Sequence, residues 1–269
     1  MNYKLLFPTY RNRYRFIEKR LGNLASQGQL LKALNLGGGE GDYDAMIAGY
    51  CRQVVSCDIN EQDVAFGRQL NSDIPNLQYQ VENALDLSFP TATFDLLISV
   101  EVLEHVGQPA KMMQEIGRVL QPGGKALITF PSLDFPITYD PINRIASLFT
   151  KKKVISQGAY AFGHDYLIPP IAFREWAHEN GLEILEERNM SGYLVGFLEM
   201  YWTGLVQRIF KANASNLSGQ EAARGKLRPS RKAPALVFLT DMVLAADHFL
   251  FSKMHYSVGK GFVLQKRAK

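Results

Sequence analysis

Cysteine is scarce in this sequence, and long uncharged runs are absent. Of the 269 residues only Cys51 and Cys57 are cysteines, and they do not form a CxxC pair. This excludes a disulfide framework and a cysteine-based zinc site, and we expect two small buried side chains in a reducing compartment. No stretch of about 18 or more residues is free of charge, so we predict no membrane-spanning helix.

The sequence also lacks a large excess of either positive or negative charge. Lys and Arg number 30 against 26 Asp and Glu, which leaves a net charge of +4. A balance this mild gives no reason to expect DNA as a partner. The apolar run at the N-terminus is too short for a signal peptide, so we expect a cytoplasmic protein.

Short apolar runs alternate with helical patterns over the first half of the chain. The runs cover 33–36, 53–57, 77–81, 94–100 and 125–130, and the helical patterns fall near 42–50, 61–71 and 109–120. Such alternation, with nearly continuous apolar strands, favours a parallel sheet covered on both faces. Beyond it we predict a helix at 171–180 ended by Gly181, a strand at 182–189 and a final strand at 261–266.

A glycine-rich turn follows the first predicted strand. The segment 34–41 reads LNLGGGEG, so a strand runs directly into a turn that opens a helix. Glycines allow the backbone to approach a ligand closely. The second predicted strand ends at Asp58, whose carboxylate can accept both hydroxyl groups of an adenosine ribose. The turn lacks a Walker lysine, which disfavours a nucleoside triphosphate.

Two further segments carry a resemblance to a known family. Residues 94–106 (FDLLISVEVLEHV) and 119–125 (VLQPGGK) are similar to the fourth-strand motif and the following turn of the class I S-adenosylmethionine-dependent methyltransferases. The branch that they resemble contains the ubiquinone- and menaquinone-pathway enzymes. The resemblance implies a Rossmann-like α/β fold: a seven-stranded, mostly parallel sheet with helices on both faces and a helical insert before the last strand.

The resemblance also implies which residues hold S-adenosylmethionine. The glycine turn would cradle the methionine part, Asp58 the ribose, Asn83 and Ala84 the adenine, and Ser99 and Glu101 would line the path to the methyl group. The full set is Gly37, Gly38, Gly39, Gly41, Asp58, Ile59, Asn83, Ala84, Ser99 and Glu101. Asn35 and Asn83 stand where the family usually has acidic residues, so the site has lost charge at two positions.

Four residues are candidates for assisting the transfer. Glu101, Glu104 and His105 are spaced to share one face of a helical turn, and His164 follows 59 residues after His105. The set resembles the metal site of small-RNA 2′-O-methyltransferases and of ubiquinone-pathway O-methyltransferases. A magnesium, manganese or zinc ion there would lower the pKa of an acceptor hydroxyl. The alternative is a metal-free arrangement in which His105, His164 or Glu101 acts as a base, or simply packs.

The chain divides into three predicted parts. Residues 1–30 form an N-terminal helical segment, 31–190 with 256–269 form the methyltransferase core, and 191–255 form a helical insert. The insert is either a lid over the acceptor, a homodimer interface or additional core. Its connector 211–232 carries six cations and one acid, which suits peripheral contact with anionic lipid headgroups.

Functions from two classes remain open. The first is O-methylation of a small-molecule, lipid-linked or saccharide acceptor, with or without a metal. The second is cofactor binding without transfer, suggested by Asn35 and Asn83. Small-RNA 2′-O-methylation is a further alternative, although the sequence contains no recognisable RNA-binding module.

Overall fold

The computed structural model describes residues 2–28, 31–133, 167–198, 232–254 and 256–268, together with the single positions 145, 148 and 149. It separates into two compact units. The larger comprises Arg13–Leu133, Tyr166–Arg188 and Gly259–Lys269, and the smaller comprises Met1–Asn12, Asp134–Asp165 and Asn189–Val258. Each is described by itself below.

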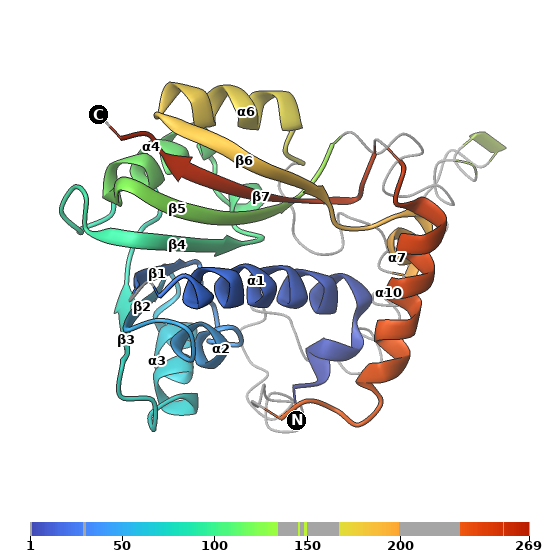
Figure 1. The fold of residues 1–269 in the computed structure, drawn as a ribbon, viewed down its shortest axis with the longest axis horizontal. Helices are drawn as coiled ribbons and strands as arrows, with labels where there is room; N and C mark the ends of the chain where they lie inside the picture. The colour runs from blue at the N-terminus through green and yellow to red at the C-terminus, as the bar shows by residue number, and fades with distance from the viewer. Residues whose placement is uncertain are drawn as a thin grey trace. The chain divides into compact units, whose positions relative to one another are not determined.

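A seven-stranded sheet organises the larger unit (Figure 1). The strand order is β3-β2-β1-β4-β5-β7-β6, and β7 runs antiparallel to β5 whereas β1 to β5 pair in parallel. This confirms the mostly parallel, seven-stranded sheet that the sequence predicted. The strands are β1 (Lys32–Leu36), β2 (Gln53–Asp58), β3 (Leu77–Val81), β4 (Phe94–Val100), β5 (Leu120–Pro131), β6 (Leu182–Asn189) and β7 (Gly259–Lys266).

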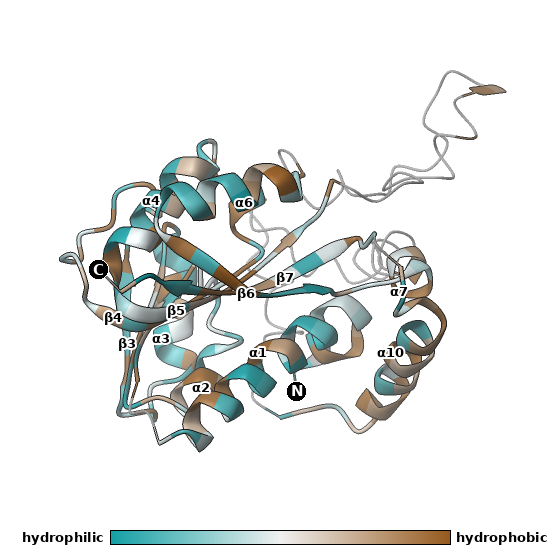
Figure 2. Ribbon diagram, turned by 45° about the horizontal axis from the view of Figure 1, so that its top comes forward, coloured by the Kyte–Doolittle hydropathy of each residue, from teal (hydrophilic) through white to brown (hydrophobic). Residues whose placement is uncertain are grey.

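Helices lie on both faces of this sheet. In Figures 1 and 2, α4 and α6 lie on one face and α2 lies on the other. The helices are α1 (Pro8–Ser26), α2 (Asp44–Ala48), α3 (Glu61–Leu70), α4 (Pro109–Val119) and α6 (Pro170–Glu179). Helix α6 ends as expected, because Gly181 has a φ of 67° and its amide donates to the His178 carbonyl.

The largest difference from a predicted strand boundary lies in β5, whereas β1 and β7 begin only one and two residues earlier than predicted. Strand β5 begins at Leu120 rather than at Lys125, so the predicted turn lies inside the strand. Leu120 pairs with Phe94, and the register then shifts before Leu96 pairs with Lys125. The glycines absorb this irregularity, since Gly123 has a φ of 79°. The glycines do form a turn-like irregularity as predicted, but pairing with β4 continues the strand on both sides of it.

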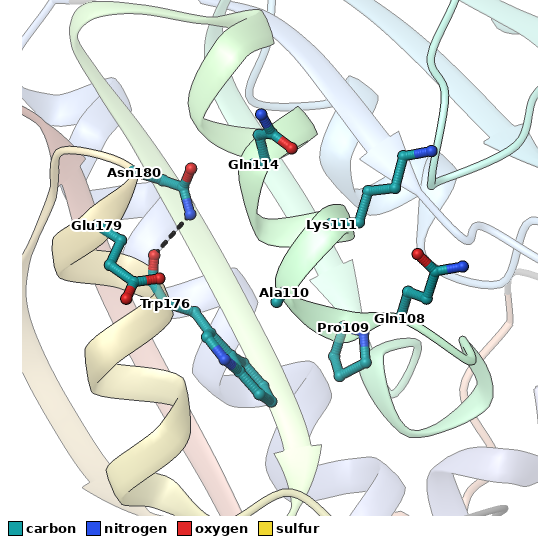
Figure 3. A pocket seen from close by; sticks show the side chains of 8 residues that line it. All are labelled: Gln108, Pro109, Ala110, Lys111, Gln114, Trp176, Glu179 and Asn180. Carbon is teal, nitrogen blue, oxygen red and sulfur yellow. Dashed lines mark hydrogen bonds between the residues drawn. The ribbon is translucent and has the colours of Figure 1, made fainter.

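Aromatic packing joins α6 to the centre of the sheet. Phe130, Phe173 and Phe262 are fully buried, and their ring centroids lie 4.7, 5.3 and 4.4 Å apart. Each such pair contributes about 0.5–1.5 kcal/mol beyond simple burial. Trp176 packs against the core and lines a groove of about 560 Å³ between α4 and α6. In Figure 3 its indole extends toward Pro109 and Ala110.

The two cysteines are buried and free, as expected. Cys57 lies in β2 and Cys51 just before it. Burial raises the pKa of the Cys51 thiol to about 12 and that of Cys57 further still. Both side chains therefore remain neutral thiols and act as small apolar groups.

In the described part of the smaller unit, the predicted insert forms the helices α7 (Tyr193–Phe197) and α10 (Val237–Phe251). The Asp247 carboxylate of α10 accepts from the amides of Gly192 and Val195, at 2.7 and 3.1 Å, and so caps the start of α7. Tyr193 and Phe251 add an edge-to-face ring contact at 5.5 Å. Most of the connector 211–232 lies outside the described residues.

Within the described ranges, no helix has both the length and the apolarity needed to cross a membrane.

Candidate functional site

The glycine turn after β1 has the tight geometry expected of a ligand cradle. Gly37 and Gly38 both donate their amides to the Cys57 carbonyl, at 2.8 and 2.9 Å, which holds the turn against the end of β2. A Cβ on Gly37 would lie 2.3 Å from a Val102 methyl, and Gly37 also has a φ of 76°. Any side chain there would displace the loop.

Unlike Gly37, Gly39 has no atoms packed against the position of a Cβ. Its φ is 52°, and a Cβ built on it would meet no atom within 4 Å. The outer side of the turn therefore faces open space, where the backbone can approach a ligand.

Asp58 closes β2 beside this turn. One carboxylate oxygen accepts from the Gly39 amide at 2.9 Å, and the other accepts from the Asn60 amide at 3.0 Å. A carboxylate has about four acceptor positions, so each oxygen keeps capacity for one hydroxyl. Ile59, next in the chain, is 69% exposed although it is apolar. The structure thus places a half-buried acceptor and an apolar surface side by side at the end of one strand.

The predicted adenine residues follow β3. The Asn83 side chain is exposed, and its oxygen accepts from the Leu85 amide at 3.0 Å. Ala84 is partly buried against the core. The assignment of these residues to adenine stays a prediction.

A buried polar network lies beneath the glycine turn. Asn35 donates to the Asp44 carboxyl at 2.7 Å, and both residues are buried. Asn71 donates to the Gly41 carbonyl at 3.2 Å and to the Tyr79 hydroxyl at 2.7 Å. Burial raises the pKa of Asp44, while the hydrogen bond from Asn35 opposes that rise. The carboxyl group that Asn35 lacks is therefore present nearby, on α2.

Because of this network, we expect that replacing Asn35 with an acidic residue, as is usual in the family, destabilises the fold. Asn35→Asp would put two carboxyl groups in contact, so one must hold a proton or the pair must separate. We expect a loss of about 1–3 kcal/mol in the free energy of unfolding, measured by denaturant titration. The double variant Asn35→Asp with Asp44→Asn restores one acid and one amide, and should recover most of that loss. Equal stability of the single variant and the parent would contradict the proposed contact.

Glu101 follows β4 and is held at both carboxylate oxygens. Arg13 of α1 donates to one oxygen at 3.1 Å, and the Thr129 hydroxyl of β5 donates to the other at 3.0 Å. The backbone of Glu101 is left-handed, with a φ of 56°. Such a conformation costs a non-glycine residue free energy and points to a functional or structural constraint. Neither Arg13 nor Thr129 was identified from the sequence.

The predicted helical turn proved shorter than the spacing argument required. Only Leu103–His105 form a 3-10 turn, called η2 here, so Glu101 precedes it and does not share a helix face with His105. Glu104 is completely buried, and within the described structure neither of its oxygens has a hydrogen-bond partner. The His105 side chain is 43% exposed, with its Nε2 3.9 Å from a Glu104 oxygen.

The environment of Glu104 shifts its titration strongly. Burial, and then the nearby charge of Glu101, raise the pKa of Glu104 well above its ordinary value of 4.5. Arg13 opposes this shift. Burial therefore favours the neutral, protonated form of the Glu104 carboxyl.

This shift makes a testable contribution to stability. Because the folded-state pKa is raised, the contribution is complete below about pH 4.5 and is lost as pH rises toward the folded-state value. As pH rises above about 4.5, the parent should therefore lose stability relative to Glu104→Gln. Thermal unfolding of both proteins over this pH range measures the change. Glu115→Gln is the matched control, since its hydrogen bonds with Arg118 lower the Glu115 pKa. Its difference from the parent should stay nearly constant above about pH 4.5 and should change in the opposite direction only below that pH, as Glu115 becomes protonated.

A family model described as "Methyltransferase domain" matches residues 34–128, from β1 to β5. A probable S-adenosylmethionine-dependent methyltransferase of Mycolicibacterium smegmatis is 31% identical over 129 residues, which cover 48% of this chain and 47% of that protein. A ubiquinone/menaquinone biosynthesis C-methyltransferase of Hydrogenovibrio crunogenus is 40% identical over 101 residues, 35% of this chain and 40% of the relative. Over this segment the chain is similar to S-adenosylmethionine-dependent methyltransferases.

This chain spans about half the length of these relatives or less. Their full activities are therefore not assigned to it by similarity alone. A solved structure, the (4+2)-cyclase SpnF, matches with a TM-score of 0.57 at 17% identity, covering 93% of this chain and 82% of its own. That similarity shows the fold alone. It also illustrates that this fold serves more than one kind of protein.

The residues present fit S-adenosylmethionine. The glycine turn, Asp58 and the exposed Ile59 stand together at the ends of β1 and β2. At the end of β4 the hydroxyl of Ser99 is buried without a hydrogen-bond partner in the described part of the chain. Buried polar groups are normally satisfied, so Ser99 is suited to a bound ligand or water.

The predicted metal set is not assembled by the described residues. Among them, no three or more His, Cys, Asp or Glu side chains are grouped so that they could hold a metal ion. Glu101 is paired with Arg13, and Glu104 is buried. The fourth member, His164, lies outside the described residues, so its role stays a prediction.

Proposed function

We propose that this chain methylates an oxygen of a small-molecule, lipid-linked or saccharide acceptor. The observation that carries the proposal is the position of His105, a half-exposed imidazole one residue after the buried Glu104, close in sequence to the end of β4. In a parallel α/β sheet, ligands bind at the carboxyl ends of the strands. An alcohol or phenol must lose its proton to become nucleophilic, so a base in this region serves the reaction.

The chain's own groups would divide the work as follows. When bound, S-adenosylmethionine supplies an electrophilic methyl group. His105 would take the proton of the acceptor hydroxyl, so that the acceptor oxygen becomes nucleophilic. Glu101, fixed by Arg13 and Thr129, would hold the wall of the site in place. A Glu104 oxygen lies 3.9 Å from the His105 Nε2, close enough to stabilise the positive charge that His105 would gain.

A second candidate is methylation of a ring carbon. The relative from Hydrogenovibrio crunogenus is named a C-methyltransferase, and it matches this chain over 101 residues. Loss of a phenolic proton activates both the oxygen and the ring carbons, so the same base suits either outcome. Product analysis distinguishes them, because only an O-methyl group is removed by ether cleavage.

The experiment follows release of S-adenosylhomocysteine. The chain is incubated with methyl-labelled S-adenosylmethionine and fractionated cell extract, and label is traced into the extracted products. Transfer should depend on an acceptor fraction and yield an O-methylated product. Tight cofactor binding with no release above the blank would instead favour the binding protein without transferase activity.

A further inference from the structure

Helix α10 of the smaller unit has its apolar side outward. Its exposed positions include Phe238, Leu239, Met242, Phe249 and Leu250, which are 54, 48, 64, 85 and 63% exposed. Ala245 and Ala246 are exposed as well. At about 100° per residue, these seven side chains fall within an arc of roughly 140°. That arc contains no charged residue, and Figure 2 shows much of α10 in brown.

The polar residues of α10 face the opposite way. Asp247 and Thr240 are buried, with Asp247 capping α7 and the Thr240 hydroxyl donating to the Leu6 carbonyl at 3.1 Å. Asp241 accepts two hydrogen bonds from Arg11, at 2.9 and 3.0 Å. The acids of this helix are therefore neutralised or buried within the unit. An ordinary surface helix shows the reverse pattern, with its apolar stripe inward.

Cations flank this apolar face, and acids do not. Lys232 precedes the helix and Lys253 follows it, and both are exposed. In the sequence, Arg224, Lys226, Arg228 and Arg231 come just before Lys232, with no acid between Glu221 and Asp241. No acid follows Asp247 either. A contiguous apolar patch bordered by positive charge is complementary to a surface whose interior is apolar and whose outer layer is anionic.

We propose that the outer face of α10 docks on a bilayer surface rich in anionic phospholipids. The helix has 15 residues and so extends about 22 Å, less than the hydrocarbon core of about 30 Å. It lies in the interface plane, with Phe238, Met242 and Phe249 among the acyl chains. The lysines at its ends meet the headgroups. This docking is independent of the proposed transfer chemistry.

The experiment is vesicle co-sedimentation of the full chain. Vesicles of phosphatidylglycerol mixed equally with phosphatidylcholine are compared with vesicles of phosphatidylcholine alone. The chain should bind the mixed vesicles, and binding should fall sharply at about 1 M salt, where charges are screened beyond about 3 Å. Met242→Glu and Phe249→Glu should each weaken partitioning about tenfold or more, since burying one large apolar side chain is worth at least that factor.

The matched control is Ile171→Glu, which changes a 68% exposed apolar residue on α6 and should bind as the parent does. Equal binding to both vesicle types, or no loss in either α10 variant, would overturn the proposal. Sedimentation velocity tests whether a second copy of this chain covers the face instead. A stable dimer that Phe249→Glu converts to a monomer, with no vesicle binding, would assign the face to a second copy and also overturn membrane docking.

Discussion

The His105→Ala variant is expected to lower kcat by about a hundredfold to ten-thousandfold while its affinity for S-adenosylhomocysteine changes little. Removal of a general base typically costs this much, because the proton must then pass to solvent. Cofactor affinity should persist because His105 is not among the residues assigned to the cofactor. Steady-state kinetics with the acceptor found by labelling gives kcat, and calorimetry gives the affinity.

His178→Ala is the matched control, since His178 is an exposed histidine on α6. It should retain the parent rate. A parallel reaction with a chelator separates two roles for His105. If chelation stopped transfer and added magnesium, manganese or zinc restored it, His105 would be a metal ligand together with His164, as the first of the sequence-based alternatives had it. Unchanged kcat in His105→Ala would remove the residue from the chemistry altogether.

Replacing Asp58 with alanine is expected to weaken binding of S-adenosylhomocysteine by about tenfold to more than a hundredfold. Hydrogen bonds to a charged group are each worth about 1.5–3 kcal/mol, and a tenfold change corresponds to about 1.4 kcal/mol. Calorimetry measures the affinity of folded protein directly. Unchanged affinity would contradict the assignment of Asp58 to the ribose.

Asp58 also binds the amides of Gly39 and Asn60, so its loss can loosen the turn as well as the ligand. A ligand lacking one ribose hydroxyl separates these effects. The parent should bind S-adenosylhomocysteine more tightly than the 2′- and 3′-deoxy analogues, because each removes one hydrogen bond to the carboxylate. The Asp58→Ala variant should bind all three about equally if the carboxylate contacts the hydroxyls. Persistent discrimination in the variant would assign the ribose to another residue.

Much of the larger unit was predictable because its signals are local. Strands β1, β2 and β4 are short, mostly apolar runs, and burial of Leu34, Val54 and Leu97 follows from that pattern. The turn from Gly37 to Gly41 and the ending of β2 at Asp58 depend on a few adjacent residues. Similarity to a known family supplied the seven-stranded, mostly parallel sheet, which the topology confirms. The extension of β5 to Leu120 was the largest departure from the local pattern, because pairing with β4 overrode that pattern.

By itself the sequence determined the strands, the glycine turn and the acid that follows β2, since each depends on neighbours along the chain. Tertiary structure alone decided which polar groups meet. Arg13 reaches Glu101 across 88 positions, and no spacing rule relates a residue of the first helix to one after the fourth strand. Burial likewise decided that the pKa of Glu104 is raised. It also decided that α10 turns Asp247 inward and Phe249 outward, because a helix with apolar residues all round carries no sequence signal for which face packs.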